Sequence, residues 1–206
     1  MQSTQLEPCV KGNALAMLIE EAQRALQHGV LQAKRLGTLP HDLQKLIEHG
    51  ALPTEWYPVL YYSLLGELLC TTTKVERVEY LRNLGVKDFA RLKRARTYRQ
   101  LDYLVKLDAK RDLGTQLHDA RLITSLMTSI FNFSRWGPAA DPKNPKYLVI
   151  QVTDAAAIPE VFRLLTEGFQ TAMNRDIKPL ARAVRSERPR PDLIVFRSTG
   201  PKPGGA

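Results

Sequence analysis

The sequence has little cysteine, no long apolar run and no secretion signal. Its 206 residues include two cysteines, Cys9 and Cys70, in no spacing typical of a metal site or a disulfide, which favours a reduced, cytoplasmic chain. No stretch of about 18 uncharged apolar residues occurs, so no membrane-spanning helix is expected. Met1–Val10 lacks the basic start and apolar segment of a signal peptide.

The short motifs of common enzyme classes are also missing. There is no Gly-x-Ser-x-Gly for a nucleophilic serine, and no His-Glu-x-x-His or Cys-x-x-Cys for zinc. Gly200–Gly204 contains prolines where a phosphate-binding loop needs Gly-Lys-Ser/Thr before a helix. The sequence therefore predicts no catalytic residue and no metal site, and the chain is expected not to be an enzyme.

Acidic residues are fewer than basic ones, and the difference is local. The chain carries 30 Lys and Arg against 21 Asp and Glu, a net charge of +9. Residues 82–111 hold 10 basic and 3 acidic side chains, and residues 175–206 hold 8 and 3. Such blocks are either solvated faces or surfaces for nucleic acid, anionic lipid or an acidic partner. The candidate residues of a basic face are Arg91, Lys93, Arg94, Arg96 and Arg99.

Apolar residues repeat at helical spacing through the N-terminal three-fifths of the chain. The pattern predicts helices over Gly12–His28, with Gly29 as a stop, and over Pro40–His49. Thr54 is expected to cap the most apolar helix, which continues to Leu69. Four further helices are predicted over Lys74–Leu84 (ended by Gly85), Asp88–Arg96, Tyr98–Leu107 and Asp112–Ile130.

Strand patterns begin near Phe131. They cover Phe131–Trp136, Tyr147–Val152, Leu180–Arg185 and Leu193–Arg197, with a loop over Gly137–Lys146 and a helix over Pro159–Asn174 that Asp154 would cap. Helices followed by strand–strand–helix–strand–strand predict an α+β fold, with an N-terminal helical layer packed on a four-stranded antiparallel sheet. We expect one domain over residues 11–199, and disordered tails over residues 1–10 and 200–206.

Several of these residues carry a resemblance to a known family. They are the helix Gly12–His28, the motif Leu52-Pro53-x-x-Trp56-Tyr57-Pro58, the motif Tyr80-Leu81-x-x-Leu84-Gly85, and the ββαββ unit with Glu167-Gly168 in its helix. The chain resembles an uncharacterised domain expanded in myxobacteria and related deltaproteobacteria. That family is similar to the superfamily of the haem-NO-binding domain, the 4-vinyl reductase domain and the TRAPP Golgi-transport subunits.

The resemblance implies a pocket between helices and sheet, where relatives hold haem, a small hydrophobic molecule or a lipid chain. Haem needs a proximal histidine, for which His118 is the candidate, and haem-binding relatives also carry Tyr-x-Ser-x-Arg for the propionates. The nearest string here, Asn132-Phe133-Ser134-Arg135, lacks the tyrosine at the matching spacing. The expectation is therefore no cofactor.

Large aromatic side chains and a few polar ones could line such a pocket, although an ordinary core would use the same residues. The candidates are Trp56, Tyr57, Tyr61, Arg121, Ser125, Phe133, Arg135, Trp136, Phe162 and Phe169. The first hypothesis is a non-enzymatic sensory or protein-interaction domain of bacterial signalling, with a protein partner or a second copy and a small apolar ligand. The alternatives are a basic protein that binds nucleic acid or an acidic partner through residues 82–111, and a haem-based gas sensor.

Overall fold

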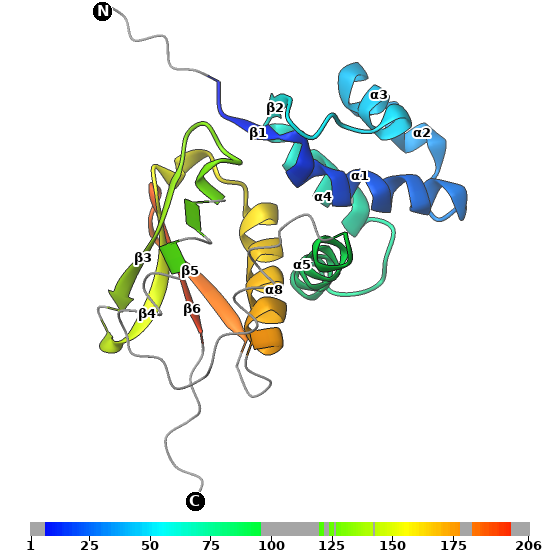
Figure 1. Ribbon diagram of the computed structural model, residues 1–206. Coiled ribbons are helices and arrows are strands. Elements are labelled where there is room, and N and C mark those ends of the chain that lie inside the picture. Colours follow the sequence, from blue (N-terminus) through cyan, green and yellow to red (C-terminus); the bar gives the residue numbers. More distant parts are fainter. Residues whose placement is uncertain are drawn as a thin grey trace, which may run out of the picture.

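The helices come first along the chain and the four-stranded sheet comes last (Figure 1). The computed structural model describes residues 7–95, 120–121, 124–125, 127–141, 143–177 and 183–198. Within them the helical layer contains α1 (Gly12–Gln27), α2 (Ala33–Leu36), α3 (His41–His49), α4 (Leu60–Cys70) and α5 (Arg77–Arg94). The predicted helix over residues 98–107 and His118 lie outside the described residues. The described residues between 120 and 128 are helical.

The early helices follow the sequence pattern closely. α1 buries Leu15, Leu18 and Ile19 on the face that the apolar spacing predicts. Gly29 ends this region with a φ of +68°, and its N–H donates to the carbonyl of Leu26. Glycine reaches this left-handed conformation without the steric cost that a side chain would add. The helices predicted over residues 12–28 and 40–49 are confirmed.

A two-stranded sheet replaces the predicted start of the central helix. β1 (Cys9–Lys11) pairs antiparallel with β2 (Trp56–Pro58), and the N–H of Val59 donates to the carbonyl of Pro8. α4 consequently begins at Leu60, and Thr54 is not its cap. Pairing across the chain overrides the local helical pattern. Cys9 and Val10, assigned above to a disordered tail, therefore lie in a strand, where Val10 is fully buried.

α5 is one helix where two were predicted. It runs through Gly85 because that glycine faces the backbone of α8 (Glu160–Ile177) and not solvent. A Cβ on Gly85 would lie 1.9 Å from the carbonyl oxygen of Leu165, and one on Gly168 would lie 1.9 Å from that of Arg82. Only glycines allow the two helices to approach this closely, so Gly85 serves helix packing instead of helix termination.

The sheet consists of β3 (Arg135–Asp141), β4 (Asn144–Thr153), β5 (Val184–Arg190) and β6 (Leu193–Ser198), all paired antiparallel. Its order is β3-β4-β6-β5, and α8 lies between this sheet and the helical layer (Figure 1). The α+β prediction is therefore confirmed. A short 3₁₀ turn, η1 (Ala155–Ala157), joins β4 to α8. Asp154, predicted to cap the helix that follows, instead precedes this turn with a φ of +54° and makes no side-chain capping hydrogen bond.

The first strand lies further along the chain than predicted. The predicted loop over residues 137–146 is wrong where the structure describes it, because residues 137–141 lie in β3 and residues 144–146 lie in β4. Phe131 forms an isolated bridge to Val10. Proline misled the prediction, because Pro138 lies on β3 at the edge of the sheet. An edge strand tolerates a residue without an N–H. In the part of the chain that the structure describes, every helix is too short or too polar to span a bilayer.

Candidate functional site

Five aromatic rings occupy the junction between the helical layer and the sheet. Phe162 of α8 lies edge-on to Phe131, with ring centroids 4.8 Å apart, and edge-on to Trp136 of β3 at 6.0 Å. Trp136 stacks between Phe131 at 6.2 Å and Phe196 of β6 at 5.8 Å. Tyr62 of α4 meets Phe162 at 5.0 Å. All five side chains are buried, and we call them the aromatic cluster.

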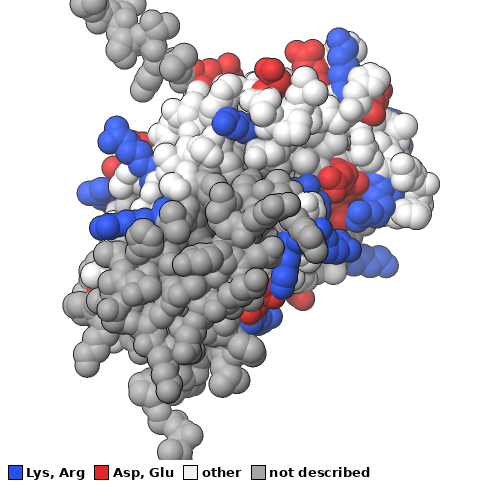
Figure 2. Space-filling view, in the orientation of Figure 1, with Lys and Arg blue, Asp and Glu red and all other residues white. Residues whose placement is uncertain are grey.

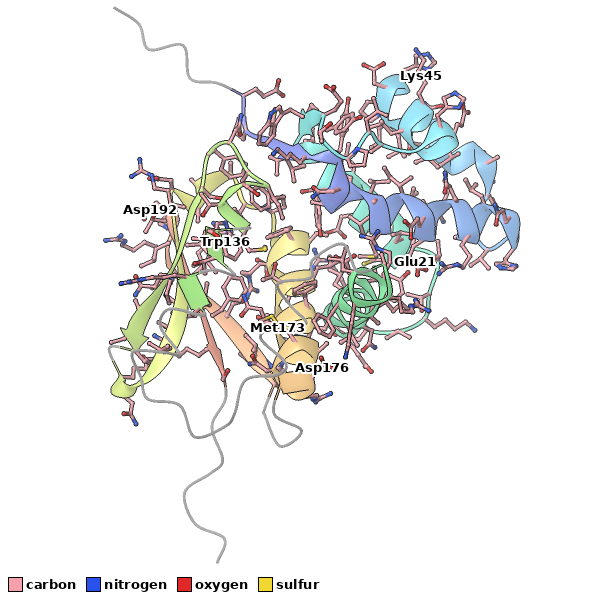
Figure 3. All side chains as sticks on the ribbon, in the orientation of Figure 1. Glu21, Lys45, Trp136, Met173, Asp176 and Asp192 are labelled. Atoms are coloured by element: carbon pink, nitrogen blue, oxygen red, sulfur yellow. The ribbon has the colours of Figure 1, made fainter. Side chains whose placement is uncertain are left out.

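The polar atoms of Trp136 are held by neighbouring hydroxyls. Its indole Nε1 donates to the Oγ of Ser134 at 3.1 Å, and its backbone N–H donates to the Oγ1 of Thr128 at 3.2 Å. Ser134 is itself buried. Figure 3 places Trp136 on the side of the sheet that faces α8. A buried indole with a satisfied N–H needs no ligand to complete it.

Only some of the predicted pocket residues meet at this junction. Trp136 and Phe162 belong to the aromatic cluster, and Phe133 touches its edge with a ring 5.5 Å from that of Phe131. Phe169 instead packs on Phe89 of α5, with ring centroids 5.4 Å apart. Tyr62 and Phe196 were not predicted, although Tyr62 has helical spacing to Leu65 and Leu69, and Phe196 belongs to the apolar run Leu193–Phe196.

The remaining pocket candidates lie at or near the surface. Trp56 is 45% exposed, with the Lys11 ammonium 5.2 Å from its ring centroid, while Tyr57 accepts a hydrogen bond from the N–H of Leu52. Tyr61 is half-buried. The exposed polar candidates are Arg121, Ser125 and Arg135. The side chain of Arg135 is 83% exposed and forms an ion pair with Asp154 at 3.3 Å.

A buried carboxylate at the α5–α8 crossing was not predicted. The Glu167 side chain is 1% exposed, and Arg82 of α5 donates to it at 2.7 Å. Arg163, one turn earlier on α8, donates at 3.1 Å, and the N–H of Ser186 on β5 donates at 2.8 Å. Glu167 thus joins two helices and the sheet. A single charged residue inside an amphipathic pattern gives little sign of this role in the sequence.

The described part of the predicted basic face is largely neutralised. Arg91 donates to Asp88 at 2.9 Å and reaches Glu20 at 3.5 Å, while Lys93 pairs with Asp176 on α8. Burial raises the pKa of Asp88 although Arg91 opposes the shift. Arg94 is exposed at the end of α5. Arg96 and Arg99 lie outside the described residues, and on the described surface in Figure 2 basic and acidic side chains are interspersed.

A shallow groove of about 480 Å³ lies beside the start of α8 and the end of the β5–β6 hairpin. Its Arg188 donates to the carbonyls of Ala155, Ile158 and Pro191. Glu160 pairs with Arg163, and Arg190 pairs with Asp192. The charged groups of this groove are therefore engaged within the chain. Among the described residues, no group of three or more His, Cys, Asp or Glu could hold a metal ion.

Comparison with solved structures identifies the architecture. One chain, described as "Structural insights into the molecular mechanism of H-NOX activation", aligns with 93% of this chain and 98% of its own at a TM-score of 0.55 and 11% identity. The chain has an H-NOX-like fold. A second H-NOX-like match, described as "Modulating Heme Redox Potential Through Protein-Induced Porphyrin Distortion", covers 91% and 99% at a TM-score of 0.53 and 10% identity. No protein-family model and no curated protein matched the sequence.

The described residues do not fit the haem pattern of Tyr-x-Ser-x-Arg. If Ser134 takes the place of the serine, Asn132 and Trp136 stand where the tyrosine and the arginine would be. Arg135, the nearest guanidinium in sequence, pairs with Asp154 on the exposed side of the chain. Asn132 accepts from the N–H of Cys9 at 2.7 Å and donates to the carbonyl of Glu7 at 3.0 Å, so it fastens the N-terminal segment. The likeness to the other predicted relatives stays a prediction.

Proposed function

We propose that this chain is a non-enzymatic signalling domain that acts by binding a protein partner. The observation that carries the proposal is the H-NOX-like fold over more than nine-tenths of the chain. The description of one matched structure concerns the mechanism of its activation. A fold alone does not assign a function, so the proposal needs support from this chain's own side chains.

Packing at the junction favours a partner over a small ligand as the molecule that the domain recognises. In the described residues, the aromatic cluster lies between the helices and the sheet, where a ligand was expected, and all five rings are buried. The surface, in contrast, presents large apolar side chains to solvent. Those described as exposed are Val30, Leu52, Trp56, Leu60, Val75 and Val86. Contiguous groups of exposed apolar side chains mark sites of protein association, so any of these six that lie together are the candidates.

Site-specific photo-cross-linking tests the proposal. A benzophenone amino acid replaces each of these six residues in turn, and the cells that naturally produce the protein are irradiated. We expect one discrete adduct from neighbouring positions and none from the others. Irradiation of the purified chain alone is the control, because an adduct there identifies a second copy as the partner.

Native mass spectrometry of gently extracted protein distinguishes binding of a small ligand from binding of a protein partner. Six silent cross-linking positions together with a bound small molecule would replace the partner proposal by a small-ligand sensor. Six silent positions and a bare chain would refute both.

The two other hypotheses have less support from the described residues. A haem-based gas sensor draws support from the fold, but the residues around Ser134 depart from the propionate pattern. Binding of nucleic acid through residues 82–111 stays a prediction, with Arg91 and Lys93 already paired to carboxylates. Binding to an unrelated DNA duplex that does not weaken as salt rises would contradict it, because phosphate contacts release counterions.

A further inference from the structure

The aromatic cluster has the properties of a filled site. Phe131, Trp136 and Phe196 lie nearly parallel, with interplanar angles of 14° between the first pair and 20° between the second. Phe162 closes the stack from α8 with its ring at 82° to Phe131. Stacked and edge-to-face contacts of this kind stabilise aromatic pairs beyond the burial of their area. The rings come from the helical layer, α8 and the sheet, so together they join the layers.

The three stacked rings are apolar except for the indole of Trp136. Its indole N–H is bound to Ser134, which is buried beside it. Acidic groups of a prosthetic group need a cation or several donors at this position. An indole in place of the arginine of the pattern offers neither, because its one donor is already used.

We propose that the Phe131–Trp136–Phe196 stack takes the place of a prosthetic group, so that the chain reaches its stable fold without haem. This inference goes beyond the proposed function, because a partner-binding domain could exist with or without haem. It also predicts a latent cavity. Removal of the indole from a well-packed apolar site leaves a space that an apolar molecule of matching shape can occupy.

Hemin titration of the full chain tests the first part. We expect the absorbance spectrum to remain that of free hemin, with no Soret band of a ligated iron, and the melting temperature to stay unchanged. A saturable, one-to-one Soret band accompanied by a higher melting temperature would overturn the proposal. Cross-linking to a partner does not depend on this outcome, so the two proposals fail separately.

Rescue of a truncated variant tests the second part. Trp136→Ala is expected to lower the melting temperature by about 10 °C, in line with large-to-small core substitutions in a chain of this size. Added indole should recover several degrees in this variant and none in the wild type. Phe89→Ala is the matched control, because Phe89 is a buried ring that pairs with Phe169 outside the cluster.

The two substitutions together decide the result. Recovery with indole in Trp136→Ala but not in Phe89→Ala supports a filled site at the stack. Equal recovery in both, or none in Trp136→Ala, contradicts it. If Trp136→Ala does not fold, Trp136→Leu leaves a smaller space, and the same comparison is made with benzene.

Discussion

At the scale of single residues, Glu167 connects two helices and the sheet. Its carboxylate accepts hydrogen bonds from α5, from α8 and from β5, and its side chain is 1% exposed. A buried charge is costly unless its partners are complete, so loss of one member leaves the others uncompensated. The arrangement therefore fixes geometry more than it adds net stability.

Glu167→Gln is expected to lower the free energy of unfolding by about 2–3 kcal/mol, because the amide removes the negative charge that compensates Arg82 and Arg163. Urea denaturation measures the change. Glu67→Gln is the control, since Glu67 pairs with Arg77 near the surface and its loss should cost less than about 1 kcal/mol. Equal effects from both substitutions would show that Glu167 does not hold the two helices and the sheet together as a buried carboxylate.

A second prediction concerns how the contribution of Glu160 to stability depends on pH. Its hydrogen bond to Arg163 lowers the pKa of the carboxyl below the ordinary range, although burial opposes this. A carboxyl with a lowered pKa stabilises the fold at neutral pH, and the contribution is lost as pH falls through the folded-state value. Glu160→Gln should therefore cost less than about 1 kcal/mol at pH 7, given the exposure of the pair. Urea curves should show this difference shrinking below about pH 4; a difference that grows in acid would contradict the assignment.

At the scale of elements, the crossing of α5 and α8 depends on two glycines. Alanine normally stabilises an exposed helix position by about 1 kcal/mol relative to glycine, so the sign of the effect is informative. At Gly85 and Gly168, a Cβ would instead collide with backbone oxygens of the facing helix. Backbone cannot move aside as a flexible side chain can.

Gly85→Ala and Gly168→Ala are each expected to destabilise the protein, by about 3 kcal/mol, because they force the helices apart. Thermal unfolding followed by circular dichroism measures the effect. Gly137→Ala is the control, since no atom lies within 4 Å of a Cβ built there. A stabilising effect of the helix substitutions would mean that the two helices do not pack this closely.

At the scale of the whole molecule, α8 lies between the helical layer and the sheet. Through Phe162 of α8, the aromatic cluster contacts both of these layers. Tyr62 links α4 to Phe162, and Trp136 links Phe162 to the sheet. A core shared in this way favours cooperative unfolding of both layers together.

The two tryptophans allow this to be measured. Trp56 is exposed and Trp136 is buried, so in a Trp56→Phe variant the fluorescence reports on the core alone. We expect its urea transition to coincide with the loss of helical circular dichroism. Two separate transitions would mean that the helical layer and the sheet unfold independently.

Much of the fold could be predicted because local periodicity identifies an element whenever one of its faces is buried. α1, α3 and α8 follow this rule, and β6 is identified instead by the apolar run Leu193–Phe196. The order of these elements predicts an α+β architecture. The errors arose where a distant segment changed the outcome. Trp56–Pro58 pairs with β1 in place of starting a helix, and Gly85 packs on α8 in place of ending one.

The candidate site, like the fold, could be predicted only in part. The amino-acid pattern alone predicts the class of the fold, and it shows the lack of the common catalytic and zinc motifs and a set of large aromatic side chains. That Trp136 and Phe162 meet Tyr62 and Phe196, while Phe169 packs elsewhere and Trp56 faces solvent, is visible only in the folded chain. Hydrophobicity tells which residues avoid water, because it is a property of each side chain. Which of them meet depends on helix crossings and strand register, which arise between segments far apart in the chain.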